Sequence, residues 1–241
     1  MPLLDHFHPP LSMERPWEGI HSTWAATMAM QLNQDQLPDD YFAMPLVTIG
    51  GGVQVDVGTF QTDVQQESTN GGIVTQTWAP PQPPLSAVVD FVSLDVYEVR
   101  VMQQMGGPQL RAAIELVSPA NKDRASHRRA FAIKCAGYLQ QSIAVVIVDV
   151  ITARIANLHA ELVDLLGLAP ALTWCSPSHL YAVAYRPVQA AVAQRLEAWP
   201  AALTVGAALP TVPLWLSPEL CLPLALEENY RATCAALRIH V

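Results

Sequence analysis

Basic residues are scarce in this chain. Lysine and arginine number 13 against 21 aspartates and glutamates in 241 residues, which leaves a formal net charge of −8 at pH 7. Proteins that hold a nucleic-acid duplex usually present a basic face, so this balance argues against an extended duplex-binding surface. One basic cluster lies within thirteen residues: Lys122, Arg124, His127, Arg128, Arg129 and Lys134. It is either a local positive field beside an acidic site or the solvated start of a helix.

Cysteine is rare and widely spaced. The four residues, Cys135, Cys175, Cys221 and Cys234, form no CxxC pair, so we expect reduced core thiols and neither a disulfide nor a zinc framework. The histidines lack the spacing of a helix-borne zinc pair, and His6, His8 and His179 are expected on the surface. The chain has no GxSxG nucleophile elbow, which argues against a serine hydrolase.

Long uninterrupted apolar runs are missing as well. Segment 198–218 carries no charged residue, but Pro200, Pro210, Pro213 and Pro218 interrupt it. Proline prevents the continuous helix that a bilayer requires. The first residues lack the basic start and apolar run of a secretion signal. We therefore expect a soluble, cytoplasmic protein without a membrane partner.

Half of the chain is hydrophobic, and its periodicity predicts a single α/β domain with a central mixed sheet flanked by helices. We expect helices at 18–34, 126–140, 153–166, 187–199 and 224–237, and strands at 44–49, 53–60, 96–103, 109–117, 143–151 and 180–185. The domain spans residues 1–241, with a loop insertion at 61–85 and a C-terminal extension at about 187–241. The turn at 106–108 predicts a hairpin between strands 96–103 and 109–117.

Two predicted strands contain an acid among apolar residues. Glu115 lies between Ile114 and Leu116, and Asp56 lies between two valines. A buried carboxylate needs a cation, a metal or a hydrogen-bond donor, so two such acids followed by lysines suggest a divalent-metal nuclease site. Alternatively, each acid points to the polar face of its strand. Asp149 is either a third site acid or a strand-end cap, and the cap is the preferred interpretation.

Several motifs in this order resemble a bacterial family catalogued as domain of unknown function 4058, common in planctomycetes and cyanobacteria. The resemblance covers nearly the whole chain and rests on residues 17–21, 55–57, 114–122, 134, 145–149 and positions between 199 and 230. Its most specific segment is Ser118-Pro119-Ala120-Asn121-Lys122. The family looks like a relative of the PD-(D/E)xK restriction-endonuclease-like superfamily, which uses an aspartate, a glutamate and a lysine around magnesium. The resemblance therefore implies a restriction-endonuclease-like core with a strand and loop insertion.

The resemblance also implies site residues. Asp56 and Glu115 would bind Mg²⁺, with Mn²⁺ as a substitute, and Glu18 on the first helix would add a ligand. The superfamily lysine stands two positions after the glutamate, where this chain has Val117. Lys122 or Lys134 must then supply the catalytic cation. Lys134 is preferred because it stands at the helical position where related families place a migrated lysine, and from there it can reach back toward the Glu115 strand. Val55 and Ile147 depart from the proline and glutamate of the family pattern, and His21 matches a family position with a structural or functional role.

Two functions follow from this interpretation. The first is metal-dependent phosphodiester hydrolysis of DNA or RNA, with carboxylates on neighbouring strands and a lysine that positions water. The second is a nuclease-like fold that no longer cuts and serves as a protein-interaction or assembly module, with a protein partner or a second copy of itself. The acidic composition and the departures from the motif favour the second function.

Overall fold

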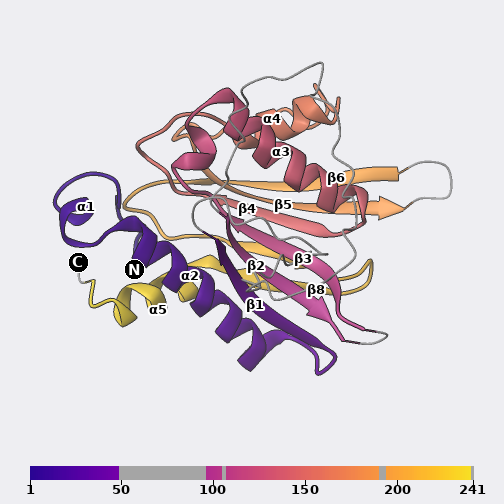
Figure 1. Cartoon of the computed structure of the whole chain (residues 1–241), viewed down its shortest axis with the longest axis horizontal. Helices are drawn as coiled ribbons and strands as arrows, with labels where there is room; N and C mark the ends of the chain where they lie inside the picture. The colour runs from indigo at the N-terminus through magenta and orange to yellow at the C-terminus, as the bar shows by residue number, and fades with distance from the viewer. Residues whose placement is uncertain (49–95, 105–106, 190–193, 240–241) are drawn as a thin grey trace, which may run out of the picture. The chain divides into compact units, whose positions relative to one another are not determined.

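The structure is a computed structural model that describes residues 1–48, 96–104, 107–189 and 194–239. These residues belong to one compact unit formed by residues 1–51 and 92–241. A six-stranded sheet of order β1-β2-β3-β4-β5-β6 runs through it (Figure 1). The strands are β1 (Tyr41–Thr48), β2 (Val96–Gln103), β3 (Gln109–Leu116), β4 (Ala144–Asp149), β5 (Leu180–Gln189) and β6 (Gln194–Leu203). The prediction of an α/β fold with a mixed sheet flanked by helices is confirmed.

The sheet is mixed because one crossover interrupts an antiparallel series. β1, β2 and β3 are antiparallel neighbours, as are β4, β5 and β6, whereas β3 and β4 run parallel. A parallel connection needs a crossover, usually a helix, and α3 (Ala125–Gln140) follows the short 3-10 helix η2 (Ala120–Lys122) in this connection. The parallel pair places the end of β3 beside the end of β4.

Helices cover both faces of the sheet. The ring of Tyr97 on β2 stacks on His21 of α2 (Trp17–Gln31), with ring centroids 3.8 Å apart. The next side chain along β2, Glu98, accepts a hydrogen bond from Tyr138 of α3. Since successive strand residues point to opposite faces, α2 and α3 lie on opposite sides of the sheet.

The remaining elements complete these two layers. α4 (Leu158–Leu165) contacts α3, and α5 (Leu226–Ala236) contacts α2. A second sheet pairs β7 (Thr211–Trp215) with β8 (Cys221–Ala225), and β7 packs against β3 to β6. The chain also has a short α1 (Leu11–Glu14) and a π-helical turn η1 (Leu32–Gln36) after α2.

Apolar periodicity accounts for the core. The predicted helical stripe is buried in the core. Trp17, Ile20, Trp24 and Met28 belong to α2, and Leu32 is the first residue of η1. All six residues of β4 are buried, as expected for a continuous apolar strand in a sheet centre.

The predicted hairpin of β2 and β3 contains a β-bulge. Met102 pairs with Leu110, but Val101 pairs with Ala112, so Arg111 is an extra residue on β3. The bulge shifts the register by one residue and thereby sets Glu98 directly opposite Glu115.

One predicted helix is wrong. Residues 187–199 do not form a helix: β5 continues to Gln189 and β6 begins at Gln194. Residues in segment 194–203 alternate between sheet faces, and Glu197 pairs directly with Arg186 across the two strands. The alanines and glutamines of segment 187–199 have helical propensity, but tertiary pairing with β5 overrides it.

Other local predictions need smaller corrections. The helix expected at 153–166 begins only at Leu158, after the N-cap Asn157. His6 is buried, not on the surface, and Cys175 and Cys221 are exposed, although all four thiols are free as expected. The strand predicted at 53–60 and the loop at 61–85 lie outside the described residues. Among the described helices, none has the length and apolar character needed to cross a membrane.

Candidate functional site

Two glutamates face each other on neighbouring strands. Glu98 of β2 and Glu115 of β3 are directly opposite in the antiparallel ladder, and their exposed fractions are 0% and 1%. Their carboxyl groups are close enough to share a hydrogen bond. Burying two carboxylates side by side is unfavourable unless a cation or a proton compensates them.

Lys134 supplies that cation from α3. Its Nζ lies 2.6 Å from Glu115 Oε2 and 3.6 Å from Glu98 Oε2. The side chain is 20% exposed, so the amine lies at the boundary between the carboxylates and solvent. The expectation that Lys134 reaches back to the Glu115 strand is confirmed.

Glu98 has further donors. Arg100 Nε donates to Glu98 Oε1 at 2.7 Å, and the Tyr138 hydroxyl lies 3.1 Å from both carboxylate oxygens. Arg100 and Glu98 share a face because they are two residues apart on one strand. Glu115, by contrast, has one oxygen, Oε1, that is fully buried and receives no hydrogen bond from a donor in the described residues.

The different surroundings separate the pKa values of the two acids. Burial, together with the negative charge of Glu98, raises the pKa of Glu115 to about 8, although Lys134 opposes this shift. Burial also acts to raise the pKa of Glu98, but Lys134 and Arg100 outweigh it and the pKa falls below its ordinary value. At neutral pH the pair therefore holds one proton, which Glu115 carries.

The second candidate lysine has a different partner. Lys122 Nζ lies 2.8 Å from Asp149 Oδ2, and both side chains are fully buried. Asp149 Oδ1 accepts the backbone N–H of Ile151, as expected of a strand-end cap. Burial raises the pKa of Asp149 to about 6 although Lys122 lowers it. The structure thus assigns Lys122 to the end of β4 and not to the glutamate pair.

The other predicted site residues are not gathered here. Glu18 is exposed on α2, which covers the face opposite the one that Glu98 and Glu115 occupy. His21 is buried and its Nε2 bonds the carbonyl of Leu116, so its role is structural. Burial lowers the pKa of His21 to about 3, which keeps the ring neutral. Asp56 lies outside the described residues.

Sequence reasoning missed Glu98. The signal was available, because Glu98 interrupts the apolar run of a predicted strand just as Glu115 does. A regular hairpin that pairs Gln103 with Gln109 would set Glu98 opposite Ile114, on the other face from Glu115. The two acids face each other because of the bulge at Arg111, and the sequence analysis contained no signal that predicted this bulge.

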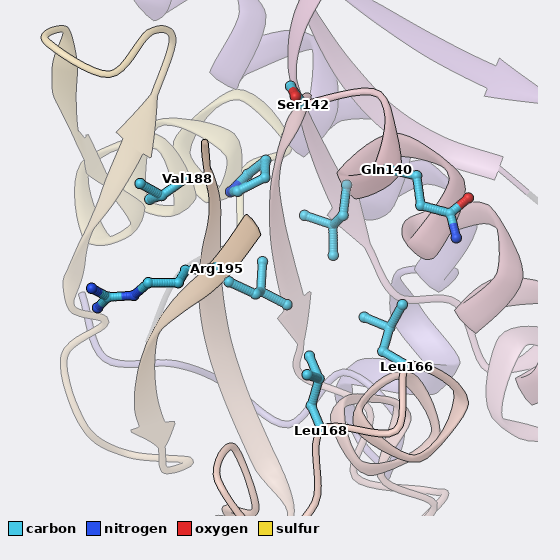
Figure 2. Close-up of a pocket in the computed structure, with 9 residues that line it drawn as sticks. Gln140, Ser142, Leu166, Leu168, Val188 and Arg195 are labelled. Atoms are coloured by element: carbon cyan, nitrogen blue, oxygen red, sulfur yellow. The ribbon is translucent and has the colours of Figure 1, made fainter. Parts of the chain in front are cut away.

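A separate hollow of about 180 Å³ lies between α3, α4 and the β5–β6 hairpin. Figure 2 shows Leu166 and Leu168 beside it, while the guanidinium of Arg195 extends away from them. No charged group therefore reaches into this apolar hollow from the residues that line it, and it indicates no particular ligand.

Comparisons with known proteins found no match: no protein-family model, no curated protein and no solved structure is significantly similar to the chain.

The glutamate pair offers carboxylate oxygens of the kind that bind cations. Hard divalent cations prefer oxygen ligands. The two opposed carboxyl groups would supply two such ligands, and Oε1 of Glu115 has no hydrogen-bond donor in the described residues. The described residues contain no group of three or more His, Cys, Asp or Glu that could hold a metal. Further ligands would have to be backbone oxygens, water or residues outside the described ranges.

Proposed function

We propose that this chain is a metal-dependent phosphodiesterase acting on nucleic acid, with a restriction-endonuclease-like core formed by α2, β1 to β3, α3 and β4. The observation that carries the proposal is the pair of opposed, buried glutamates on neighbouring strands beside Lys134. In this assignment Glu98 takes the role that the family resemblance gave to Asp56. Asp56 remains a predicted further ligand.

The residues of the site have distinct tasks in such a reaction. Glu98 and Glu115 would bind Mg²⁺ or Mn²⁺, and the bound cation would lower the pKa of a coordinated water and neutralise phosphate charge. Burial alone would lower the pKa of Lys134, but the charges of Glu115 and Glu98 raise it by more, so the net shift is upward. The amine therefore stays protonated and stabilises negative charge; it cannot act as a general base. Arg100 is partly exposed and adds a second positive charge next to Glu98.

Cation binding must compete with the proton on Glu115. Because the pKa of Glu115 is raised to about 8, the apparent affinity for Mn²⁺ should increase by up to about tenfold per pH unit between pH 6 and 8. A surface carboxylate with an ordinary pKa would show no such dependence in this range.

A specific observation favours the alternative, a non-catalytic interaction module. Both oxygens of Glu98 already have donors, and neither carboxylate is accessible to solvent. A glutamate pair that holds one proton and is contacted by Lys134, Arg100 and Tyr138 can serve as a structural network alone. In that case the cluster stabilises the sheet and binds no metal.

Cleavage assays separate the two functions. Purified protein is incubated with labelled single- and double-stranded DNA and RNA in Mg²⁺ or Mn²⁺, beside a Glu98→Gln, Glu115→Gln double variant. We expect cleavage by the parent and at least a hundredfold loss in the double variant, since the cation ligands are removed. A Glu161→Gln variant serves as the control, because Glu161 pairs with Arg128 on the surfaces of α4 and α3.

Thermal unfolding with Mn²⁺ at pH 6, 7 and 8 provides the second readout. A pH-dependent rise in melting temperature that vanishes in the double variant supports the metal site. The absence of both cleavage and metal-dependent stabilisation would leave the structural network as the function of this cluster.

A further inference from the structure

A polar hollow lies on the opposite face of the sheet from the glutamate pair. Its volume is about 160 Å³, and it is bounded by β3, β5, β7 and the end of α3. Arg111, Ser142, Arg186 and Trp215 line it. No acidic side chain is among its lining residues in the described part of the chain. A space of this size accommodates one oxyanion together with a few water molecules.

Both arginines are held in place. The Arg186 guanidinium lies 3.9 Å from the centre of the Trp215 ring and donates through Nε to Glu197 at 3.0 Å. Its Nη2 is 2.7 Å from the same carboxylate and its Nη1 donates to the carbonyl of Pro218 at 3.4 Å, so each of these two nitrogens keeps one further N–H for a ligand. A guanidinium fixed in this way loses little side-chain entropy when it binds a ligand.

Arg111 carries the charge that is not neutralised. Its Nε donates to the side-chain oxygen of Gln103 at 2.8 Å, and its Nη2 donates to that of Gln109 at 2.9 Å. Both partners are uncharged, and no acid of the described residues is ion-paired with Arg111. Arg111 is also the extra residue of the bulge, a feature that redirects side chains. Of the two arginines that line the hollow, only Arg186 has an acidic partner in the described residues, and that partner, Glu197, also contacts Arg195 at 3.7 Å.

Trp215 provides an independent observation. Its indole N–H is buried and has no hydrogen-bond acceptor in the part of the chain that the structure describes. Trp24, in contrast, donates its indole N–H to Asn229 at 2.9 Å. A buried donor without an acceptor is unfavourable unless a ligand or water accepts its hydrogen bond.

We propose that this hollow binds a phosphate group through Arg111 and Arg186, with the indole N–H of Trp215 as a further donor. Guanidinium groups match the charge and the geometry of phosphate oxygens, and charge-assisted hydrogen bonds are the strong ones. The phosphate can belong to a small molecule or to a nucleic-acid strand. The site is independent of the glutamate pair and of the reaction proposed for it.

Two-dimensional amide NMR of the full chain tests the site with inorganic phosphate and with a single-stranded thymidine dodecamer. We expect the Trp215 indole signal to shift downfield on titration, while that of Trp24 stays unchanged. Arg111→Gln should weaken phosphate binding about tenfold, since it removes one charged donor and breaks no ion pair. Arg154→Gln is the matched control, because Arg154 is exposed near Asp123 and does not line this hollow.

The results discriminate clearly. A shift with inorganic phosphate alone assigns the site to small phosphorylated ligands, and a tighter, Arg111-dependent complex with the dodecamer assigns it to a nucleic-acid strand. If neither titrant moves the Trp215 signal, or if Arg154→Gln weakens binding as much as Arg111→Gln, the proposal is overturned.

Discussion

At the scale of single residues, the least ordinary feature is that one lysine serves two buried glutamates. Lys134 contacts Glu115 at 2.6 Å and Glu98 at 3.6 Å, and neither glutamate reaches solvent. Arg100 also contacts Glu98, but the burial of Glu115 and the charge of Glu98 outweigh Lys134, so the folded protein favours the protonated form of Glu115. The site is therefore sensitive to pH in a range where ordinary carboxylates are not.

Stability should fall as the pH rises toward and through 8. The ordinary pKa of glutamate is 4.5, and in the folded protein burial raises the pKa of Glu115 to about 8. Between these values the folded state holds a proton that the unfolded chain releases, so the free energy of unfolding decreases with increasing pH. The stabilisation is complete below about pH 4.5 and is lost as the pH passes 8.

Urea unfolding between pH 6 and 9 in the presence of a chelator measures this effect. Glu115→Gln should flatten the curve, because an amide cannot release a proton, whereas Glu161→Gln should retain the slope of the parent. Equal slopes in the parent and in Glu115→Gln would show that the pKa of Glu115 is not raised.

At the scale of elements, the start of α4 depends on a side chain from the sheet. The hydroxyl of Tyr181 on β5 accepts the backbone N–H groups of Leu158 and His159 at 3.0 and 3.2 Å. It also hydrogen-bonds Asp149, the partner of Lys122. Asn157 caps the same helix by accepting the N–H of Ala160. One tyrosine thus joins the helix terminus to the buried ion pair at the end of β4.

Tyr181→Phe should therefore destabilise the protein more than Asn157→Ala does. Removing the hydroxyl leaves two helix N–H groups without their acceptor and takes one donor from the buried Asp149 carboxylate, which keeps Lys122 and the N–H of Ile151, at a cost of roughly 2–4 kcal/mol. Loss of an N-cap costs about 1 kcal/mol. Equilibrium unfolding of both variants gives the comparison, and a Tyr181→Phe variant that unfolds like the parent would contradict it.

The same scale shows what the sequence could and could not predict. Periodicity was sufficient for α2 and α3, whose buried residues recur at helical spacing, and the run of apolar residues was sufficient for β2, which is buried on both faces. It failed at residues 187–199, where strand pairing with β5 decides the structure and local propensity does not. The sequence analysis identified Glu115 and Lys134 but not Glu98. The contact between Glu98 and Glu115 depends on the strand register, which a one-residue bulge sets.

At the scale of the whole described unit, the two ends of the chain are bound to each other. Tyr230 of α5 is hydrogen-bonded to His6 at 2.7 Å and accepts the backbone N–H of Leu4 at 3.0 Å. Asn229 accepts the indole N–H of Trp24 on α2. Together with β7, which packs across β3 to β6, these contacts cover one face of the sheet. The segment after β6 therefore belongs to the core.

A chain that ends at Leu203 should not fold cooperatively. The deletion would remove β7, β8 and α5, expose the apolar side chains of Ile114 and Val146 on the part of the sheet that β7 covers, and leave Trp24 without its acceptor. Circular dichroism should show a loss of the near-ultraviolet signal and of a single thermal transition. In the full chain, Asn229→Ala should lower the free energy of unfolding by about 1–3 kcal/mol yet keep one transition, because only the partner of Trp24 is lost. If the shortened chain retains both signals, residues 204–241 are a dispensable extension, and the face of the sheet opposite the glutamate pair is stable without them.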